Sequence, residues 1–317
     1  MQTRQLGHSG LEVSVVGLGC NNFGGMIDAV TTDKAAAVVE TAIDAGITLF
    51  DTSDSYGIDG GSETVLGQVL GKRRKDIVLA TKFASPMGCV KSGRINGSRR
   101  YIMAAVEDSL RRLNTDYIDL YQYHFPDPLT PIEETMRALD DLVRQGKVRY
   151  LGCSNLTAWQ LVDANWTARH FGMDRLLSTQ TEYNLLERRA KTDLAPALQA
   201  AGMTLLPYFP LASGLLTGKY RKGEPLPDNT RMALPYFRKG VTDDRLDVIE
   251  RLITFCEDRG RTLLELAFSW LLADPLVSSV IAGATRPEQV TANVAASGWC
   301  LSGGDLAELD TILQPQV

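Results

Sequence analysis

Four side chains that can hold or move a proton lie near the ends of three consecutive apolar runs. Asp51 ends the first run and Tyr56 follows it, while Lys82 and His124 end the next two. A phenol, with a pKa of about 10, is a poor acid at neutral pH, but a nearby ammonium stabilises its anion and is expected to lower that pKa. A carboxylate beside a buried ammonium keeps it charged and oriented. With this support, the phenol could exchange a proton with a reacting oxygen that the imidazole also contacts.

Each of these residues also has an ordinary structural interpretation. A lone aspartate after a strand often caps the next helix, a tyrosine among Ser, Asp and Gly is usually a surface residue, and a single histidine is more often a core residue than a catalyst. Lys82 fits less easily, because an apolar strand rarely ends in lysine. Their occurrence at three consecutive strand ends favours a shared site.

The elements that would position these residues alternate between short apolar runs and longer segments of helical periodicity. The strand-like runs are Val13–Gly19, Ile47–Asp51, Ile77–Lys82, Ile118–His124, Val148–Ser154, Leu177–Gln180, Thr204–Tyr208 and Ser278–Ile281. The amphipathic segments include Asp33–Ala45, Arg99–Leu113, Ile132–Gln145, Ala158–Phe171 and Asp243–Arg259. Eight such runs without a composition break predict a single α/β domain over residues 1–317, a closed (β/α)8 barrel rather than two doubly wound domains. The Pro- and Gly-rich segments Pro86–Gly97 and Gly223–Arg238 are predicted to be long loops over the active face.

Composition and charge restrict the classes of function. The 317 residues are 44% hydrophobic and 22% charged, with a net charge of -5 and no long block of Lys or Arg, so a nucleic-acid partner is not expected. The five cysteines include no Cys-x-x-Cys pair and favour a reducing compartment. Because the sequence shows no signal-peptide pattern and no apolar run of about 18 residues, we expect a cytoplasmic protein without a membrane segment.

Several common catalytic motifs are absent. Residues 17–22 (GLGCNN) begin like a dinucleotide-binding turn, but Asn22 replaces the third glycine. Residues 214–219 (GLLTGK) are one residue short of a P-loop, and residues 152–156 (GCSNL) lack the last glycine of a serine-hydrolase elbow. The three histidines are far apart, so no metal centre built from His and Cys is expected.

The order and context of Asp51, Tyr56, Lys82 and His124 resemble the catalytic tetrad of the aldo-keto reductase family, and the likeness covers nearly the whole chain. Longer matching segments are residues 146–155 (GKVRYLGCSN), 180–184 (QTEYN), 210–219 (PLASGLLTGK) and 283–289 (GATRPEQ). The layout resembles most the bacterial reductases and the potassium-channel β-subunit-like branch. The resemblance implies a (β/α)8 TIM barrel with a long loop after strand 7. It also implies an NAD(P)(H)-dependent oxidoreductase that interconverts an aldehyde or ketone and an alcohol by hydride transfer, with Tyr56 as general acid/base and His124 on the substrate carbonyl.

The same resemblance implies a nicotinamide cofactor bound without a Rossmann domain. The matching positions are Ser154, Asn155 and Gln180 for the carboxamide, Tyr208 for the nicotinamide ring, Leu211, Ser213, Lys219 and Arg231 for the pyrophosphate, and Thr285, Gln289 and Asn293 for the adenosine. Arg286, at the start of the expected final helix, favours a 2′-phosphate and therefore NADPH/NADP+ over NADH. This chain has Ala292 where many relatives carry an acidic residue. Ordinary roles stay open: a helix N-cap for Ser154 and Asn155, and surface cations for Lys219, Arg231 and Arg286.

The loop residues that could form a substrate pocket are mainly apolar. They are Phe23, Ile58, Phe83 and Phe125, with Met26 and Met87 at least equally suited to packing beneath loops. Such walls suit a small carbonyl or hydroxyl compound. Aldehydes, ketones, sugars and polycyclic alcohols all stay possible as substrates, and the reaction could run in either direction. The four tryptophans, Trp159, Trp166, Trp270 and Trp299, are expected in the core.

Two other functions would use the same residues differently. One is an NADPH-binding regulatory or redox-sensing module with slow turnover, which reports to a protein partner. The other is a barrel isomerase or aldolase in which Lys82 forms a Schiff base with its substrate. The main prediction is an oxidoreductase for a small-molecule carbonyl or alcohol, with no nucleic-acid or membrane partner and with its oligomeric state open.

Overall fold

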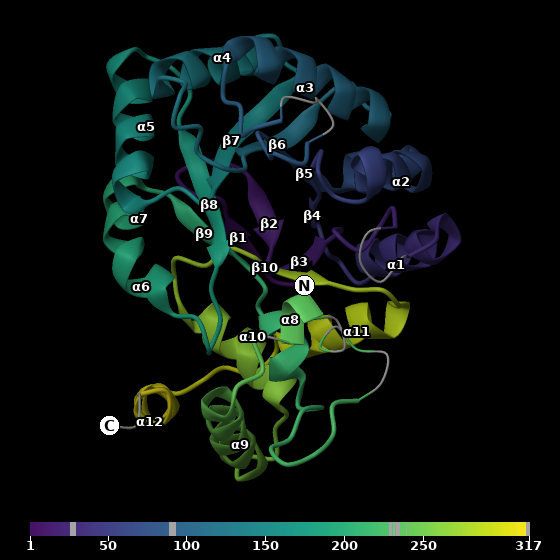
Figure 1. Cartoon of the computed structure of the whole chain (residues 1–317), viewed down its shortest axis with the longest axis vertical. Helices are drawn as coiled ribbons and strands as arrows, with labels where there is room; N and C mark the ends of the chain where they lie inside the picture. The colour runs from purple at the N-terminus through teal and green to yellow at the C-terminus, as the bar shows by residue number, and fades with distance from the viewer. Residues whose placement is uncertain are drawn as a thin grey trace.

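The centre of the molecule is a ring of parallel strands, shown in Figure 1. The structure, a computed structural model, describes residues 1–25, 30–88, 93–227, 230, 232, 235–238 and 240–314. The strands of the ring are β3 (Val16–Gly19), β4 (Leu49–Asp51), β5 (Val78–Phe83), β6 (Ile118–Tyr123), β7 (Val148–Ser154), β8 (Leu176–Glu182), β9 (Thr204–Tyr208) and β10 (Val280–Gly283). They are hydrogen-bonded in the order β10-β3-β4-β5-β6-β7-β8-β9. A parallel bridge between Leu205 and Val277 joins the two ends of the sheet, so the ring nearly closes. The predicted (β/α)8 barrel is therefore confirmed.

Helices surround the ring (Figure 1). They are α1 (Thr32–Asp44), α2 (Gly61–Leu70), α3 (Arg99–Leu113), α4 (Ile132–Arg144), α5 (Ala158–His170), α6 (Arg189–Asp193), α7 (Ala195–Ala201), α8 (Pro235–Arg238), α9 (Asp243–Glu257), α10 (Leu263–Ala273), α11 (Pro287–Ala296) and α12 (Gly303–Ile312). In α4 the apolar residues Met136, Leu139 and Leu142 recur at helical spacing and are buried. The helix ends before Gly146, whose φ of 73° favours glycine. The five amphipathic segments named from the sequence are all helices, with ends within two residues of those predicted.

The first predicted strand, Val13–Gly19, is wrong as a single element. Glu12–Ser14 forms β2, which pairs antiparallel with β1 (Thr3–Gln5), and the barrel strand begins only at Val16. Between the two strands, the side chain of Ser14 accepts a hydrogen bond from the Thr48 backbone at 2.8 Å and donates to the Val16 backbone oxygen at 2.6 Å. The hairpin carries Val13 into a second core cluster, which fills the interior of the barrel. Its buried members are Leu6, Val13, Leu49, Val78, Ala80, Leu120, Leu206 and Ile281.

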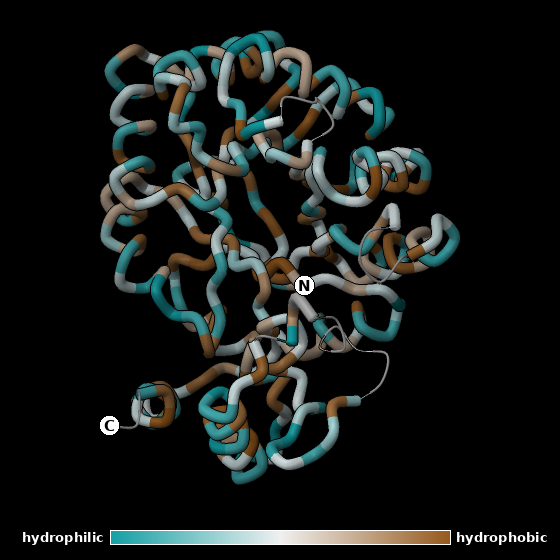
Figure 2. Tube along the Cα trace, viewed as in Figure 1, coloured by the Kyte–Doolittle hydropathy of each residue, from teal (hydrophilic) through white to brown (hydrophobic). Residues whose placement is uncertain are grey.

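Figure 2 shows hydrophobic residues along the strands and hydrophilic residues on the outer sides of many helices. Two tryptophans depart from this pattern. Trp159 and Trp166 lie on the outer side of α5 and are 67% and 61% exposed, so their expected place in the core is wrong. Trp270 is buried, and Trp299 is partly buried against the core. The inner side of α5 is already filled by small and aliphatic residues such as Leu161, which leaves the two indoles outside.

No helix within the described residues is long and apolar enough to cross a membrane. The four cysteines among them, Cys20, Cys153, Cys256 and Cys300, are free thiols.

Candidate active site

Asp51, Lys82 and His124 come together because β4, β5 and β6 are neighbours in the sheet. The carboxyl ends of parallel strands meet at one rim of a barrel. Asp51 is the last residue of β4, Lys82 lies one residue before the end of β5, and His124 directly follows β6. The loop after β4 carries Tyr56 back over the same rim. The structure therefore brings the four predicted side chains together at this rim.

The amine of Lys82 lies at the centre of the group. Its Nζ donates to both carboxylate oxygens of Asp51, at 2.9 and 2.8 Å, and to the backbone oxygen of Thr52 at 2.9 Å. It also lies 3.0 Å from Tyr56 Oη. The side chain of Lys82 is fully buried and that of Asp51 is 4% exposed. A buried charge is tolerable only when it is paired and hydrogen-bonded, and here both conditions are met.

The electrostatics of Lys82 and Tyr56 follow from burial and from Asp51. Burial alone would lower the pKa of Lys82, but the charge of Asp51 and the hydrogen bonds to Asp51 and Tyr56 outweigh burial, and the pKa lies above the ordinary lysine value. Burial raises the pKa of Tyr56, Lys82 acts to lower it, and Asp51 raises it again, so the net change is upward. The expected net lowering of the Tyr56 pKa is therefore wrong. Lys82 limits the rise, and Tyr56 is a neutral phenol that can donate its proton.

His124 stands across from Tyr56. The two rings are edge to face, with centroids 6.0 Å apart. Burial, assisted by the charge of Lys82, lowers the pKa of His124 well below the ordinary histidine value, so the imidazole is neutral. Its Nδ1 lies 3.3 Å from Ser53 Oγ, a hydroxyl that can donate to Nδ1 and so leave the ring proton on Nε2. This leaves Nε2 as the ring nitrogen available to a ligand oxygen.

Two glutamine amides also converge on Asp51. Gln180 Nε2 donates to Asp51 Oδ1 at 2.8 Å, and Gln122 Nε2 donates to the same oxygen at 3.1 Å. Gln122 was not predicted, although a glutamine inside the apolar run of β6 was a signal for it. Hydrogen bonds from the two amides and from Lys82 thus fix the orientation of the Asp51 carboxylate.

A cavity of about 920 Å³ opens above these residues at the rim. The predicted site residues in its lining are Asp51, Tyr56, His124, Phe125, Ser154, Asn155, Gln180, Tyr208, Leu211, Ser213, Lys219, Thr285, Arg286 and Gln289. Lys82 is fully buried beneath Tyr56. Asn293 is buried in α11 and does not line the cavity, and Arg231 lies outside the described residues. One continuous space thus joins the tetrad to most of the positions predicted for a cofactor.

The residues predicted for a carboxamide form a connected set. Asn155 Nδ2 donates to the His124 backbone oxygen at 3.1 Å, and Tyr208 Oη donates to Asn155 Oδ1 at 3.1 Å. Ser154 Oγ donates to the Gln180 backbone oxygen at 2.8 Å. The alternative role as a helix N-cap is wrong, because Thr157 precedes α5 and pairs there with the Gln160 side chain.

The far end of the cavity carries cations and a strained turn. Three consecutive residues, Ala212, Ser213 and Gly214, have φ values of 45°, 59° and 104°. Left-handed backbone at non-glycine residues is costly and gathers at functional sites. Lys219 follows this turn.

Arg286 also lines the cavity and is the N-cap of α11. This helix is not the final one as predicted, because α12 follows it. Lys34 of α1 and Glu288 also line this end of the cavity, and neither was predicted. Thr285 and Gln289 are bonded to each other, since Gln289 Oε1 accepts from the Thr285 backbone at 2.7 Å.

The predicted substrate-pocket residues separate into different environments. Phe125 lines the cavity and stacks on His124 with centroids 4.5 Å apart. Phe23 and Phe83 are fully buried and do not line it, so their placement in the pocket wall is corrected. Side chains alternate along a strand, and because Lys82 points into the barrel, Phe83 points outward into the core. Ile58 is 66% exposed and lies outside the lining. Met26 lies outside the described residues, and Met87 is exposed.

The arrangement disfavours Schiff-base chemistry at Lys82. A nucleophilic lysine needs a neutral, accessible amine, usually with a lowered pKa. The amine of Lys82 is fully buried, donates to three other residues and has a raised pKa. Among the described residues there is also no group of three or more His, Cys, Asp or Glu side chains that could hold a metal ion.

Comparisons with known proteins agree with the geometry. The model of the aldo/keto reductase family matches residues 15–314. Aldo-keto reductase YhdN of Bacillus subtilis is 35% identical over 321 residues, covering 99% of this chain and 94% of that protein. L-glyceraldehyde 3-phosphate reductase of Escherichia coli K12 is 35% identical over 325 residues, covering 98% and 92%. A probable voltage-gated potassium channel subunit beta of Oryza sativa is 36% identical over 306 residues, covering 93% and 91%.

Proposed function

The chain belongs to the aldo/keto reductase family, and we propose that it is an NADPH-dependent cytoplasmic enzyme that interconverts an aldehyde or ketone and an alcohol by hydride transfer. One observation carries the proposal: Asp51 holds the buried ammonium of Lys82 at 3.0 Å from the Oη of Tyr56, and Tyr56 lines a large cavity. This arrangement supports proton transfer at a single oxygen next to a neutral imidazole.

The cavity residues fit a nicotinamide dinucleotide. A carboxamide needs both donors and acceptors, and Ser154, Asn155 and Gln180 provide both at the end nearest the tetrad. Phosphate groups need cations, and Lys219 and Arg286 lie in the lining at the other end. When bound, the reduced nicotinamide supplies the hydride for the carbonyl carbon. Arg286 at the N-terminus of α11 supports NADPH, because both the guanidinium and the helix dipole favour a 2′-phosphate.

The protein residues handle the oxygen of the substrate. His124, which is neutral and lines the cavity, can donate a hydrogen bond from Nε2 to a carbonyl oxygen in the tautomer in which Ser53 Oγ donates to Nδ1. Tyr56 gives its proton to that oxygen as negative charge develops, and Lys82 stabilises the resulting phenolate. Water returns a proton to Tyr56 after turnover. In the oxidative direction the same groups remove the proton from the alcohol.

Replacing Tyr56 tests this proposal. Tyr56→Phe removes the proton donor and leaves the ring, so single-turnover reduction of a nitrobenzaldehyde by NADPH should fall by roughly 100-fold or more. NADPH binding, followed by fluorescence titration, should persist. Tyr117→Phe, the same change at a tyrosine that packs against Arg74, is the matched control and should leave both unchanged. Undiminished turnover in Tyr56→Phe would remove Tyr56 from the mechanism.

The likeness to proteins named as potassium channel β subunits supports a second candidate function. In that case the chain is an NADPH-binding regulatory module whose slow turnover reports redox state to a protein partner. Turnover assays on a broad panel of carbonyls and alcohols, with NADP(H) and with NAD(H), distinguish the enzyme from the regulatory module. Tight NADPH binding with negligible turnover on every compound would favour the regulatory module, whereas rapid turnover on any of them would favour the enzyme.

A further inference from the structure

The outer side of α5 carries a patch of large apolar side chains. We name this patch the α5 stripe; its members are Trp159, Val162, Trp166 and Phe171, which are 67%, 47%, 61% and 43% exposed. Of the eight exposed large hydrophobic residues in the described part of the chain, half lie here, on one helix and its C-cap. Scattered exposed apolar residues are normal, but a contiguous patch marks an interaction surface.

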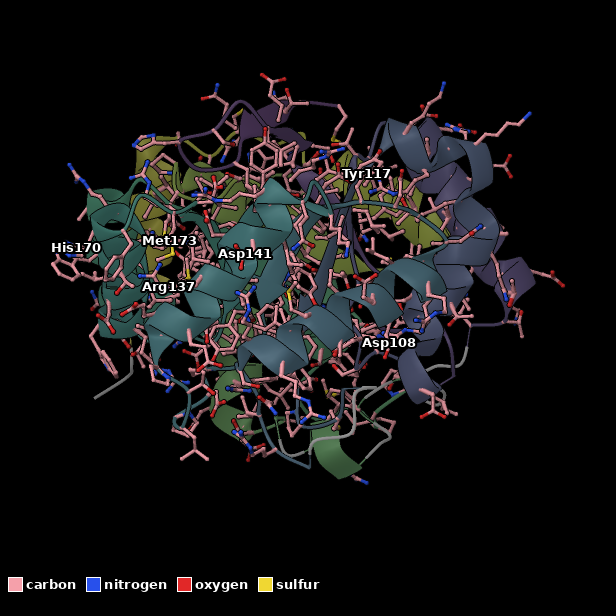
Figure 3. All side chains as sticks on the ribbon, turned by 90° about the horizontal axis from the view of Figure 1, so that it is seen from above. Asp108, Tyr117, Arg137, Asp141, His170 and Met173 are labelled. Carbon is pink, nitrogen blue, oxygen red and sulfur yellow. The ribbon has the colours of Figure 1, made fainter. Side chains whose placement is uncertain are left out.

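Two aromatic rings of the stripe, those of Trp166 and Phe171, pack against His170. Trp166 stacks on His170, with centroids 5.0 Å apart and planes within 7°. His170 meets Phe171 edge to face at 4.7 Å, and the guanidinium of Arg137 lies 4.5 Å from the Phe171 ring. Figure 3 shows His170 at the edge of the molecule, beyond Arg137 and Met173. A surface whose side chains are fixed beforehand loses little conformational entropy when a partner binds.

The charges beside the stripe are of both signs. Asp163 and Arg169 are exposed residues of α5, one on each side of Trp166 along the helix. Within the described part of the chain, neither side chain forms an ion pair or a hydrogen bond. The arginines of the neighbouring α4 differ, because Arg137 pairs with Glu133 and Arg144 pairs with Asp140.

We propose that the α5 stripe is the two-fold interface of a homodimer of this chain. Asp163 and Arg169 are three residues before and three residues after Trp166, and at helical periodicity they fall on opposite edges of the stripe. A two-fold axis near Trp166, with the two α5 helices crossing steeply, therefore brings each Asp163 beside Arg169 of the partner subunit. The surface is self-complementary, as an isologous contact requires.

The interface would leave the candidate active site accessible. No member of the α5 stripe lines the cavity, and α5 belongs to the outer ring of helices (Figure 1). Each subunit would keep its own cavity, so the dimer does not depend on the proposed function. The indoles would be the central contacts, which agrees with the enrichment of tryptophan at interface hot spots.

The mass of the purified full chain in solution tests the proposal. Sedimentation equilibrium and light scattering, over a wide range of concentration, should give twice the monomer mass. Trp166→Glu places two like charges at the centre of the contact and should raise the dimer dissociation constant by roughly 100-fold or more. Trp166→Phe should keep the dimer. A wild-type monomer at all concentrations, or a Trp166→Glu variant that associates like the wild type, would overturn the proposal.

A charge exchange tests the two-fold geometry. Asp163→Arg and Arg169→Asp each place like charges together and should each weaken the dimer, whereas the double variant restores opposite charges and should regain it. Glu40→Arg on α1, across the barrel, is the matched charge reversal and should have no effect. Circular dichroism checks that every variant is folded. Single reversals that leave the dissociation constant unchanged would overturn the proposed arrangement.

Discussion

The carboxylate of Asp51 can be tested by an isosteric substitution that removes its charge and one of its two acceptor oxygens. Asp51→Asn keeps an Oδ1 atom that can accept from Gln122 and Gln180, which now donate at 3.1 and 2.8 Å. It removes the negative charge that lies 2.8 Å from the amine of Lys82. The variant therefore keeps the packing of Asp51, removes its charge and places an amide donor where Oδ2 accepted from Lys82.

The expected magnitude follows from this distance. Two unit charges about 3 Å apart attract by about 5 kcal/mol at an effective dielectric constant of about 20. Removing one partner of a buried pair destabilises a protein by about 3 to 5 kcal/mol, because the remaining charge stays desolvated. Burial is the largest influence on the pKa of Lys82 and acts downward, so without Asp51 this pKa should fall.

The direction of the Lys82 pKa shift determines whether the free energy of unfolding rises or falls with pH. In the wild type, the raised pKa of Lys82 gives stability that is fully present below the ordinary lysine pKa and is lost only as pH rises through the folded value. In Asp51→Asn the pKa is lowered, so the unfolded chain binds more protons and stability increases with pH. Urea unfolding should show a deficit of about 3 to 5 kcal/mol at about pH 7 that narrows toward about pH 10. A deficit below about 1 kcal/mol, or one that does not change with pH, would refute this reasoning.

Three further predictions concern the surroundings of the tetrad and the cofactor. Ser53→Ala removes the contact to His124 Nδ1 and should lower kcat by roughly tenfold in steady-state assays, with KM little changed. Burial raises the pKa of Asp54 to about 7, so the stability of the wild type should decline as pH rises from about 4 to about 7, by up to about 4 kcal/mol. Asp54→Asn should remove that decline in unfolding curves taken across this range. Arg286→Glu should weaken NADPH binding by roughly tenfold or more in fluorescence titrations while leaving NADH binding nearly unchanged.

The sequence was most informative where the chemical pattern changes abruptly. Asp51, Lys82 and His124 interrupt or end apolar runs, and the barrel places such strand ends at one rim, so their meeting could be predicted. Gln122 was missed because its role depends on register. It lies opposite Lys82 in the β5–β6 pairing, which directs both side chains into the barrel. The register between parallel strands results from long-range packing and cannot be predicted from the local sequence pattern.

Predictions from local sequence also failed for residues whose side chains face a different way from that expected. Phe83 lies opposite Tyr123 in this register, and their rings stack outside the barrel with centroids 5.3 Å apart. Trp159 and Trp166 were assigned to the core because they fall in a segment of helical periodicity, where core packing is the default. In the structure, α5 has apolar residues on both its inner and outer sides. Periodicity identifies an apolar side but does not say which of two apolar sides faces the barrel.

Asp51 links the proton-transfer group to the wall of the cavity. The carboxylate that holds the amine of Lys82 also accepts from Gln180, whose side chain lines the space proposed for the carboxamide. A ligand that draws the Gln180 amide away would leave Asp51 with fewer donors and strengthen its effect on Lys82. A ligand that accepts from Tyr56 would act on the same amine from the opposite side. Under the proposed function, cofactor and substrate would therefore both act on the proton affinity of Tyr56 through one buried ion pair.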